Sequence, residues 1–177
     1  MKVVFDIDGT LSNPGHRLHF IQPEVGEKKN WDGVFAACGD DTPIPINVEL
    51  CQELMWVGKT SILRPSFSAS RSYVGDHIVE FWTGRREAER NVTQEWLMEH
   101  VLKTNDCYHG DEEWQDDPFP TTLKMRKDGD RRSDYIIKME FIDPLNPPDI
   151  IFEDRSTVVR AYRERGLTVF QVAEGDF

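Results

Sequence analysis

Short apolar runs alternate with longer amphipathic segments along most of the chain. The short runs predict strands at residues 2–5, 78–82, 122–125, 149–152 and 168–172. The longer segments predict helices at residues 47–57, 86–102, 134–141 and 157–165. Strands that alternate with helices in this way are typical of an α/β fold, so we predict a doubly wound, Rossmann-like parallel sheet.

The segment that follows the first strand does not keep this rhythm. It contains an aromatic stretch at residues 31–35 and a proline-rich step at residues 42–46. We therefore predict a small helical cap, or lid, inserted at residues 12–75 of a single domain that spans residues 1–177. A polar loop at residues 64–73 and an acidic loop at residues 111–118 are predicted to lack regular structure.

Composition restricts the possible classes of function. The net charge of −11 argues against a general polyanion-binding protein, because non-specific affinity for nucleic acids comes largely from Lys and Arg at phosphates. It does not exclude a local basic groove. The three cysteines have no paired spacing, which favours reduced thiols in a cytoplasmic protein. The sequence has no apolar stretch long enough for a signal peptide or a membrane span, so we expect a soluble protein with no membrane partner.

Two carboxylates follow the first predicted strand. Asp6 and Asp8 stand in the motif Asp6-Ile7-Asp8-Gly9-Thr10, directly after Val3-Val4-Phe5. Residues two apart in a strand point to the same side, and the glycine allows a sharp turn. Both carboxylates can therefore face one phosphate and one metal, with the first as a nucleophile and the second handling the proton of the leaving group. The alternative is a strand followed by an ordinary acidic turn.

A hydroxyl and a guanidinium follow the second predicted strand, in Thr83-Gly84-Arg85. A turn between a parallel strand and a helix presents hydroxyl and backbone N–H groups to an anion, so Thr83 is a candidate phosphate ligand. The alternative interpretation of Thr83 is a helix cap.

Asp134 and Lys138 are four residues apart on a predicted helix, and therefore lie on one face. They form either an exposed ion pair or a site in which Lys138 neutralises a phosphoryl group and Asp134 orients it. Arg126, Arg131 and Arg132 lie just upstream, and clustered arginines suit bidentate contacts with phosphate.

A second acidic pair, Glu153-Asp154, ends the fourth predicted strand. In a doubly wound sheet this strand end lies beside the first one. Asp154 together with Asp6 and Asp8 would supply the oxygen ligands that Mg²⁺ prefers.

The ordered motifs Asp-x-Asp-Gly-Thr, Thr-Gly-Arg, Lys and the acidic pair resemble the haloacid dehalogenase superfamily of aspartate-nucleophile phosphohydrolases. The chain is most similar to the 3′-phosphatase domain of bacteriophage polynucleotide kinase-phosphatase. Residues 4–11, Arg17, residues 126–138, residues 153–155 and the tail 170–177 carry this similarity.

The resemblance implies a role for each motif residue. Asp6 would form an aspartyl-phosphate, and Asp8 would protonate the leaving group and then activate water. Thr83 and Lys138 would hold the phosphoryl oxygens. Substrate contacts would come from Arg17, Arg85, Arg126 and Arg132, with Asp134 supporting Lys138. Mg²⁺ would be bound by Asp6, Asp154 and the backbone carbonyl of Asp8, with Glu153 holding metal-bound water.

The chain departs from the family pattern in three ways. Glu153 replaces the usual first Asp of the acidic pair, and extra residues fall around 62–75. No kinase domain is expected, because Gly58-Lys59-Thr60 lacks the preceding glycine of a phosphate-binding loop: position 53 is Glu.

The sequence therefore predicts a Mg²⁺-dependent phosphomonoesterase that acts on a phosphorylated nucleic-acid end or on a nucleotide. A nucleoside 5′-monophosphatase of the same superfamily is the alternative. An inactive module that binds phosphate or nucleic-acid ends is the alternative of another class, although such a module has no need of two carboxylates that repel each other.

Overall fold

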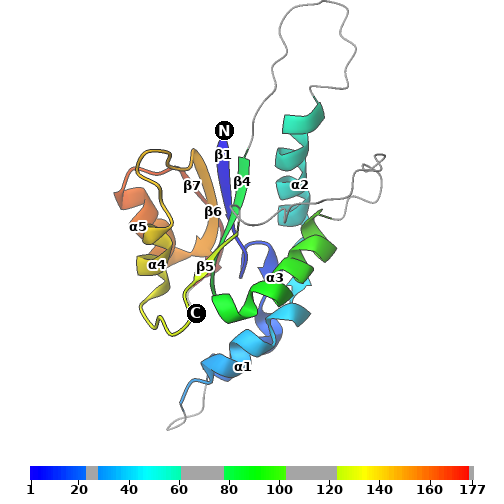
Figure 1. The fold of residues 1–177 in the computed structure, drawn as a ribbon, viewed down its shortest axis with the longest axis vertical. Helices are drawn as coiled ribbons and strands as arrows, with labels where there is room; N and C mark the ends of the chain where they lie inside the picture. Colours follow the sequence, from blue (N-terminus) through cyan, green and yellow to red (C-terminus); the bar gives the residue numbers. More distant parts are fainter. Residues whose placement is uncertain (23–27, 61–77, 103–122, 176–177) are drawn as a thin grey trace, which may run out of the picture.

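The central feature is a five-stranded parallel sheet with the strand order β5-β4-β1-β6-β7 (Figure 1). The computed structural model describes residues 1–22, 28–60, 78–102 and 123–175, so the predicted loops 64–73 and 111–118 lie outside the described residues. The strands are β1 Lys2–Asp6, β4 Ile78–Arg86, β5 Leu123–Arg126, β6 Ile150–Arg155 and β7 Val169–Gly175. The chain builds outward from β1 to β5 on one side and then places β6 and β7 on the other, which confirms the predicted doubly wound topology.

Helices cover both faces of this sheet (Figure 1). On one face lie α2 Pro45–Thr60 and α3 Arg90–Leu97, which continues into a π-helical turn at Met98–Leu102; on the other lie α4 Asp134–Glu140 and α5 Ser156–Glu164. Val3 and Phe5 of β1 pack into the first core, whereas Val4 packs into the second. Successive strand residues point to opposite faces. Burial on both faces therefore explains why β1 is a continuous apolar run.

Short elements follow β1 and lie at the carboxyl end of the sheet. They are β2 Ser12–Asn13, the 3-10 helices η1 Gly15–Ile21 and η2 Cys38–Asp40, helix α1 Trp31–Ala36, and β3 Thr42–Pro43, which pairs with β2 in an antiparallel ribbon. The predicted cap range 12–75 also contains α2. Val48 and Cys51 of that helix pack into the core beneath the sheet. The predicted cap range therefore divides in two: the short elements lie at the strand ends, whereas α2 lies on a face of the sheet.

Strand β4 is longer than the sequence pattern predicts. It runs to Arg86, and its pairing with β5 includes a shift in register between Trp82 and Arg86. The 3-10 helix η3 Glu87–Glu89 follows, so α3 begins at Arg90 rather than at residue 86. Thr83 consequently lies inside a strand, and the interpretation of Thr83 as a helix cap is wrong.

Candidate active site

The two carboxylates of the first motif lie at and just beyond the end of β1. Asp6 is the last residue of the strand and is 3% exposed. The chain then turns tightly, because the carbonyl of Ile7 accepts hydrogen bonds from the backbone N–H groups of Leu11 and Ser12 at 2.9 and 2.8 Å. Gly9 has a φ of 89°, which a residue with a side chain rarely adopts. This turn directs Asp6 and Asp8 into two different sets of neighbours.

Asp6 belongs to what we call the acid cluster, made of Asp6, Glu153 and Asp154. One oxygen of each carboxylate lies within 4.8 Å of the others. The cluster forms because β1 and β6 are parallel neighbours, so their carboxyl ends meet. Lys138 of α4 donates hydrogen bonds to Asp6 Oδ1 at 2.6 Å and to Glu153 Oε2 at 2.7 Å. Two of the three carboxylates of the cluster thus share one ammonium group.

This imbalance of charge changes the ionisation of the acid cluster. Burial raises the pKa of Asp6 well above its usual value, and the neighbouring Glu153 raises it further, against the opposing effect of Lys138. Burial likewise raises the pKa values of Glu153 and Asp154 to about 7. The cluster therefore favours a group that brings more positive charge.

The acid cluster fits a divalent cation. Among the described residues, Asp154 Oδ1 is buried with no hydrogen-bond partner, which leaves a carboxylate oxygen available as a ligand. The Asp154 carboxylate is flanked by two glycines: a Cβ atom would come within 2.2 Å of Asp154 Oδ2 if added to Gly9, and within 2.3 Å if added to Gly175. A donor set made only of carboxylate oxygens suits Mg²⁺.

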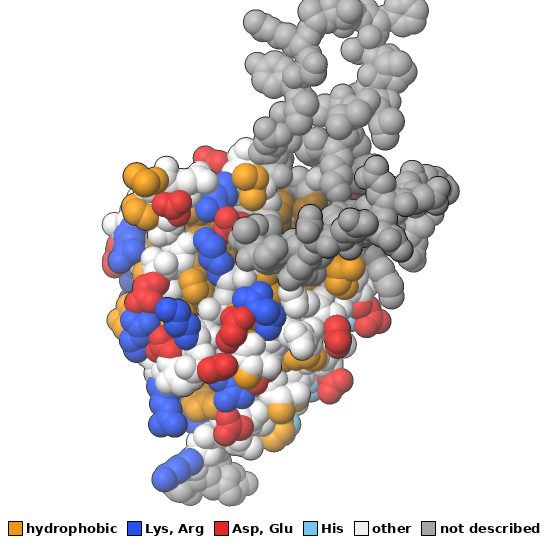
Figure 2. Space-filling model, viewed as in Figure 1, with side chains coloured by type: hydrophobic (Ala, Val, Ile, Leu, Met, Phe, Trp, Pro, Cys, Tyr) orange, Lys and Arg blue, Asp and Glu red, His pale blue; other side chains and the backbone are white. Residues whose placement is uncertain are grey.

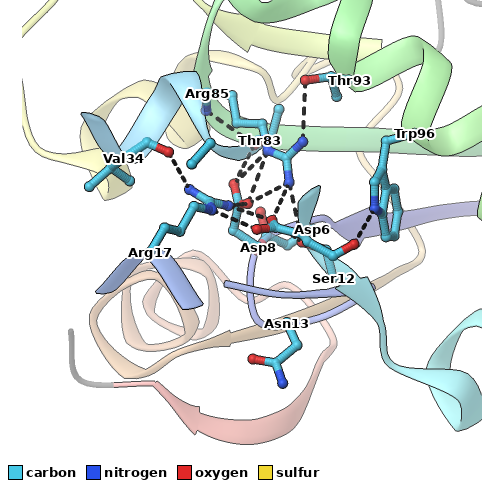
Figure 3. A network of polar contacts seen from close by, with 12 residues as sticks. Asp6, Asp8, Ser12, Asn13, Arg17, Val34, Thr83, Arg85, Thr93 and Trp96 are labelled. Carbon is cyan, nitrogen blue, oxygen red and sulfur yellow. Dashed lines mark hydrogen bonds and ion pairs between the residues drawn. The ribbon is translucent and has the colours of Figure 1, made fainter. Parts of the chain in front are cut away.

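Asp8 belongs to a second group, which we call the arginine cluster: Asp8, Asp41, Arg17 and Arg85. Figure 3 labels Asp8 and the two arginines that converge on it. Arg17 and Arg85 both donate to Asp8 Oδ1, Arg85 Nη2 at 2.8 Å. Both also donate to Asp41 Oδ2, at 2.6 and 2.8 Å respectively. Arg17 comes from η1 and Arg85 from β4, so the arginine cluster joins the short elements after β1 to the sheet.

The arginines fix the ionisation of Asp8. Burial acts to raise the pKa of Asp8, but Arg85 and Arg17 outweigh it and hold that pKa well below its usual value. Both guanidinium groups are themselves buried, with Arg17 3% and Arg85 1% exposed. Thr83 Oγ1 donates to Asp8 Oδ2 at 3.1 Å. The carboxylate predicted to handle protons is thus held ionised by three neighbours.

Asp134 connects the acid cluster to further arginines. Its carboxylate pairs with Lys138 at 3.4 Å, as their spacing on the helix predicts. It also pairs with Arg126 and Arg155, each at 3.3 Å. The position of the Asp134 carboxylate depends on Gly84, since a Cβ atom there would lie 2.3 Å from Asp134 Oδ1. The alternative prediction, that Asp134 and Lys138 form an exposed ion pair, is wrong, because Lys138 is 2% exposed.

Of the predicted site residues, Arg132 is placed differently from the rest. Its side chain is 47% exposed and pairs with Asp130 at 2.6 Å and with Glu140. Arg126 Nε donates to the carbonyl of Gly84 at 2.9 Å, which ties it to the end of β4. The structure therefore brings Arg126 beside the acid cluster through Asp134, whereas the contacts of Arg132 lie on the surface.

Comparison with known proteins identifies the family. The sequence model described as "Polynucleotide kinase PNKP phosphatase domain" matches residues 61–177, which is more than half of the chain. The chain belongs to this family. The matched range of the PNKP phosphatase family includes Thr83, Lys138 and Asp154, whereas Asp6 and Asp8 precede it.

Two solved structures resemble the chain in fold. One is a chain of the Pnkp1/Rnl/Hen1 complex, with 23% identity, a TM-score of 0.65, and coverage of 99% of this chain and 47% of that one. The other is a chain of the Pnkp1/Rnl/Hen1 RNA repair complex, with 24% identity, a TM-score of 0.59, and coverage of 99% and 43%. The chain thus spans less than half the length of these relatives. No curated protein matches it significantly in sequence.

Two residues near the clusters were not predicted. Asp41 follows η2, and no spacing in the sequence links it to the motifs of the PNKP phosphatase family. Arg155 directly follows the acidic pair Glu153-Asp154. Because that pair ends a strand beside β1, the same reasoning that identified Asp154 could have placed Arg155 near the site, where it pairs with Asp134.

No described helix is long and apolar enough to cross a membrane.

Proposed function

We propose that the chain is a Mg²⁺-dependent phosphatase that removes a 3′-phosphate from nucleic-acid ends through an aspartyl-phosphate, an acyl phosphate formed on Asp6. Membership of the PNKP phosphatase family supports a phosphatase that acts on nucleic-acid ends. One observation carries the assignment of the nucleophile. Asp6 lies in the acid cluster against Lys138, while Asp8, two residues away, lies in a separate cluster that controls its proton.

The first step is attack by Asp6. A carboxylate oxygen of Asp6 forms a bond to phosphorus, and the bond from phosphorus to the 3′ oxygen breaks. Asp6, Asp154 and the backbone carbonyl of Asp8 would hold Mg²⁺, whose charge would offset the repulsion between the carboxylate and the phosphate dianion. Glu153 positions Lys138, from which it accepts a hydrogen bond. Lys138 and Thr83 hold the phosphoryl oxygens.

Asp8 handles the protons of both steps. Asp8 takes up a proton from solvent as the phosphate dianion arrives, because a nearby negative charge raises a carboxyl pKa, and it then gives this proton to the leaving 3′ oxygen. In the second step water attacks phosphorus and gives its proton to Asp8, while the bond to Asp6 breaks and phosphate leaves. Arg85 and Arg17 lower the pKa of Asp8, so this carboxylate is ionised and has a free lone pair for the proton of water, which supports this role.

The remaining predicted roles follow from contacts. Arg17 and Arg85 act on the substrate through Asp8, to which both are bonded. Asp134 supports Lys138, and Arg126 supports Asp134. Arg132, with its exposed side chain, is the member of the predicted set that can meet the substrate outside the two clusters.

A free nucleotide is the second candidate substrate, and charge favours it. The chain carries a net charge of −11. On the face seen in Figure 2, the Lys and Arg side chains of the described residues are interspersed with Asp and Glu side chains and form no continuous basic patch. Polynucleotide affinity comes mainly from such patches.

The test is phosphate release from 3′-phosphorylated RNA and DNA oligonucleotides and from free 3′- and 5′-mononucleotides, with and without Mg²⁺. We expect Mg²⁺-dependent release that is fastest from an oligonucleotide, and we expect Asp6→Asn to abolish it. Asp40→Asn is the matched control, because Asp40 is an exposed carboxylate near the same site. Faster release from mononucleotides would establish a nucleotidase, and release by Asp6→Asn at the wild-type rate would exclude the mechanism.

A further inference from the structure

Asp41 is a carboxylate of the arginine cluster that takes no part in the proposed chemical steps. Its side chain is fully buried. Asp41 Oδ1 accepts from Arg17 Nε at 2.7 Å, while Oδ2 accepts from Arg17 Nη2 at 2.6 Å, from Arg85 Nη2 at 2.8 Å and from Ser12 Oγ at 2.9 Å. Buried hydrogen bonds between charged groups are among the strongest in proteins.

The protein core fixes Asp41 itself. The backbone carbonyl of Asp41 accepts a hydrogen bond from Trp96 Nε1 of α3 at 2.7 Å, and Trp96 is 2% exposed. Ser12, which donates to the carboxylate, belongs to β2 and is also buried. Asp41 is therefore anchored from both sides by groups that do not depend on the substrate.

Asp41 occupies the donor groups that would otherwise suit a phosphate. The planar guanidinium fork matches phosphate and carboxylate geometry equally well. Arg17 directs Nε and Nη2 to Asp41 and Nη1 to the carbonyl of Val34. Arg85 directs Nη2 to Asp41 and Nε to Asp8, with Nη1 3.4 Å from Thr93 Oγ1. Each arginine thus reaches Asp8 while a second carboxylate holds it in place.

We propose that Asp41 is a positioning residue that holds Arg17 and Arg85 on Asp8 and keeps both guanidinium groups off the phosphate. This inference rests on the proposed phosphatase function. Without the Asp41 charge, two guanidinium groups would face the single carboxylate of Asp8, and a phosphate dianion would supply the missing partner. Inorganic phosphate, the product, would then bind more tightly, and Asp8 would lose its fixed position.

His16 also lies beside Asp41. His16 Nδ1 lies 3.6 Å from Asp41 Oδ1, and its side chain is 41% exposed. The two arginines lie closer to Asp41 and carry charge at all relevant pH values. The effect of Asp41 therefore does not depend on the protonation of His16.

The decisive variant is Asp41→Asn, which keeps the shape of the side chain and removes its charge. We expect kcat to fall at least about tenfold and the inhibition constant for inorganic phosphate to fall about three- to tenfold, because released guanidinium groups bind phosphate. The matched control is Asp40→Asn, the same chemical change one residue earlier on an exposed side chain. We expect it to leave both constants within twofold of the wild type.

A purely structural role for Asp41 predicts a different result. A lower melting temperature with an unchanged inhibition constant for phosphate would overturn the proposal, whether or not kcat fell. If Asp41→Asn does not fold, Ser12→Ala provides the second variant, because it removes one donor to Asp41 and leaves the charge. We expect kcat and the inhibition constant for phosphate each to fall about twofold in Ser12→Ala. A higher inhibition constant for phosphate in this variant would overturn the proposal.

Direct phosphate binding separates this inference from the function on which it rests. Titration calorimetry of inorganic phosphate into the metal-free wild type and into Asp41→Asn needs no turnover. Absence of phosphate release from every substrate by the wild type would reject the phosphatase. Equal phosphate affinity of the two proteins would reject the role of Asp41 alone.

Discussion

The acid cluster and the arginine cluster begin two residues apart on one chain and have opposite electrostatics. Asp6 and Asp8 are both held in place at the end of β1, yet the pKa of Asp6 is raised and that of Asp8 is lowered. Burial acts in the same direction on both. The difference comes from their partners: Asp6 shares the single ammonium of Lys138 with Glu153, whereas Asp8 shares two guanidinium groups with Asp41.

This difference assigns one task to each cluster. Two cations balance two carboxylates in the arginine cluster, so it is complete in itself and can hold Asp8 rigidly. The acid cluster has more negative than positive charge, so it is complete only when a further cation binds. A motif of two carboxylates thus supplies a metal-binding nucleophile and a proton carrier because different elements approach each of them.

Removal of Lys138 should disturb the acid cluster more than any other single change. Lys138→Met removes the ammonium that is hydrogen-bonded to Asp6 and Glu153, so we expect a loss of about 3–5 kcal/mol in the free energy of unfolding and no detectable turnover. Urea unfolding with and without Mg²⁺ checks this, because Mg²⁺ should restore part of the stability. Lys127→Met, which changes an exposed lysine, is the control. Equal stability of Lys138→Met and wild type without metal would contradict the charge imbalance.

Neutralisation of Asp154 should have the opposite effect on stability. The pKa of Asp154 is about 7 in the folded protein, above its usual value of 3.8. A raised carboxyl pKa means that the folded state resists ionisation, so the penalty is absent below pH 3.8, grows as the pH rises towards 7 and is complete above that pH. At pH 8 we expect Asp154→Asn to be more stable than the metal-free wild type by about 1–3 kcal/mol, and to lose the stabilisation by Mg²⁺. Thermal unfolding at pH 8 and pH 5 measures both effects.

The wild type offers a test without mutation. Because Glu153 and Asp154 both have pKa values of about 7, Mg²⁺ must displace protons from the acid cluster below that pH. We expect the apparent affinity for Mg²⁺ to rise about tenfold per pH unit between pH 6 and 7, and to level off above pH 8. Calorimetric titration of the metal in buffers with different ionisation enthalpies counts the released protons. A flat affinity over this range would show that the cluster is already ionised.

The sheet and the meeting of the strand ends could be predicted from the sequence. The alternation of apolar runs and amphipathic helices predicted the parallel sheet. The convergence of Asp6 and Asp154 followed from it, because neighbouring parallel strands end at the same edge. These conclusions need only local patterns and a general rule of sheet topology.

Contacts that depend on register or on the path of an irregular segment were out of reach. Glu80 is buried inside β4 because Lys2 and Lys124 from the flanking strands pair with it at 3.0 and 3.1 Å. Asp41 meets Arg85 across 44 residues of sequence separation. The chain path through η1, α1 and η2 decides that contact, and no periodic pattern encodes such a path.

Replacement of Arg17 in the arginine cluster has the smallest expected effect and reports most directly on the pKa of Asp8. Arg17→Lys keeps a positive charge but loses the fork that contacts Asp8 and Asp41 together. Since Arg17 lowers the pKa of Asp8, the variant should raise it. The ionised form of Asp8 accepts the proton of water in the second step, so activity should be lost at a higher pH on the acidic side. At saturating Mg²⁺ we expect that limb of the kcat profile to move up by about half a unit to one unit, with the alkaline limb unchanged. A limb that stays in place would assign the proton transfer to a group other than Asp8.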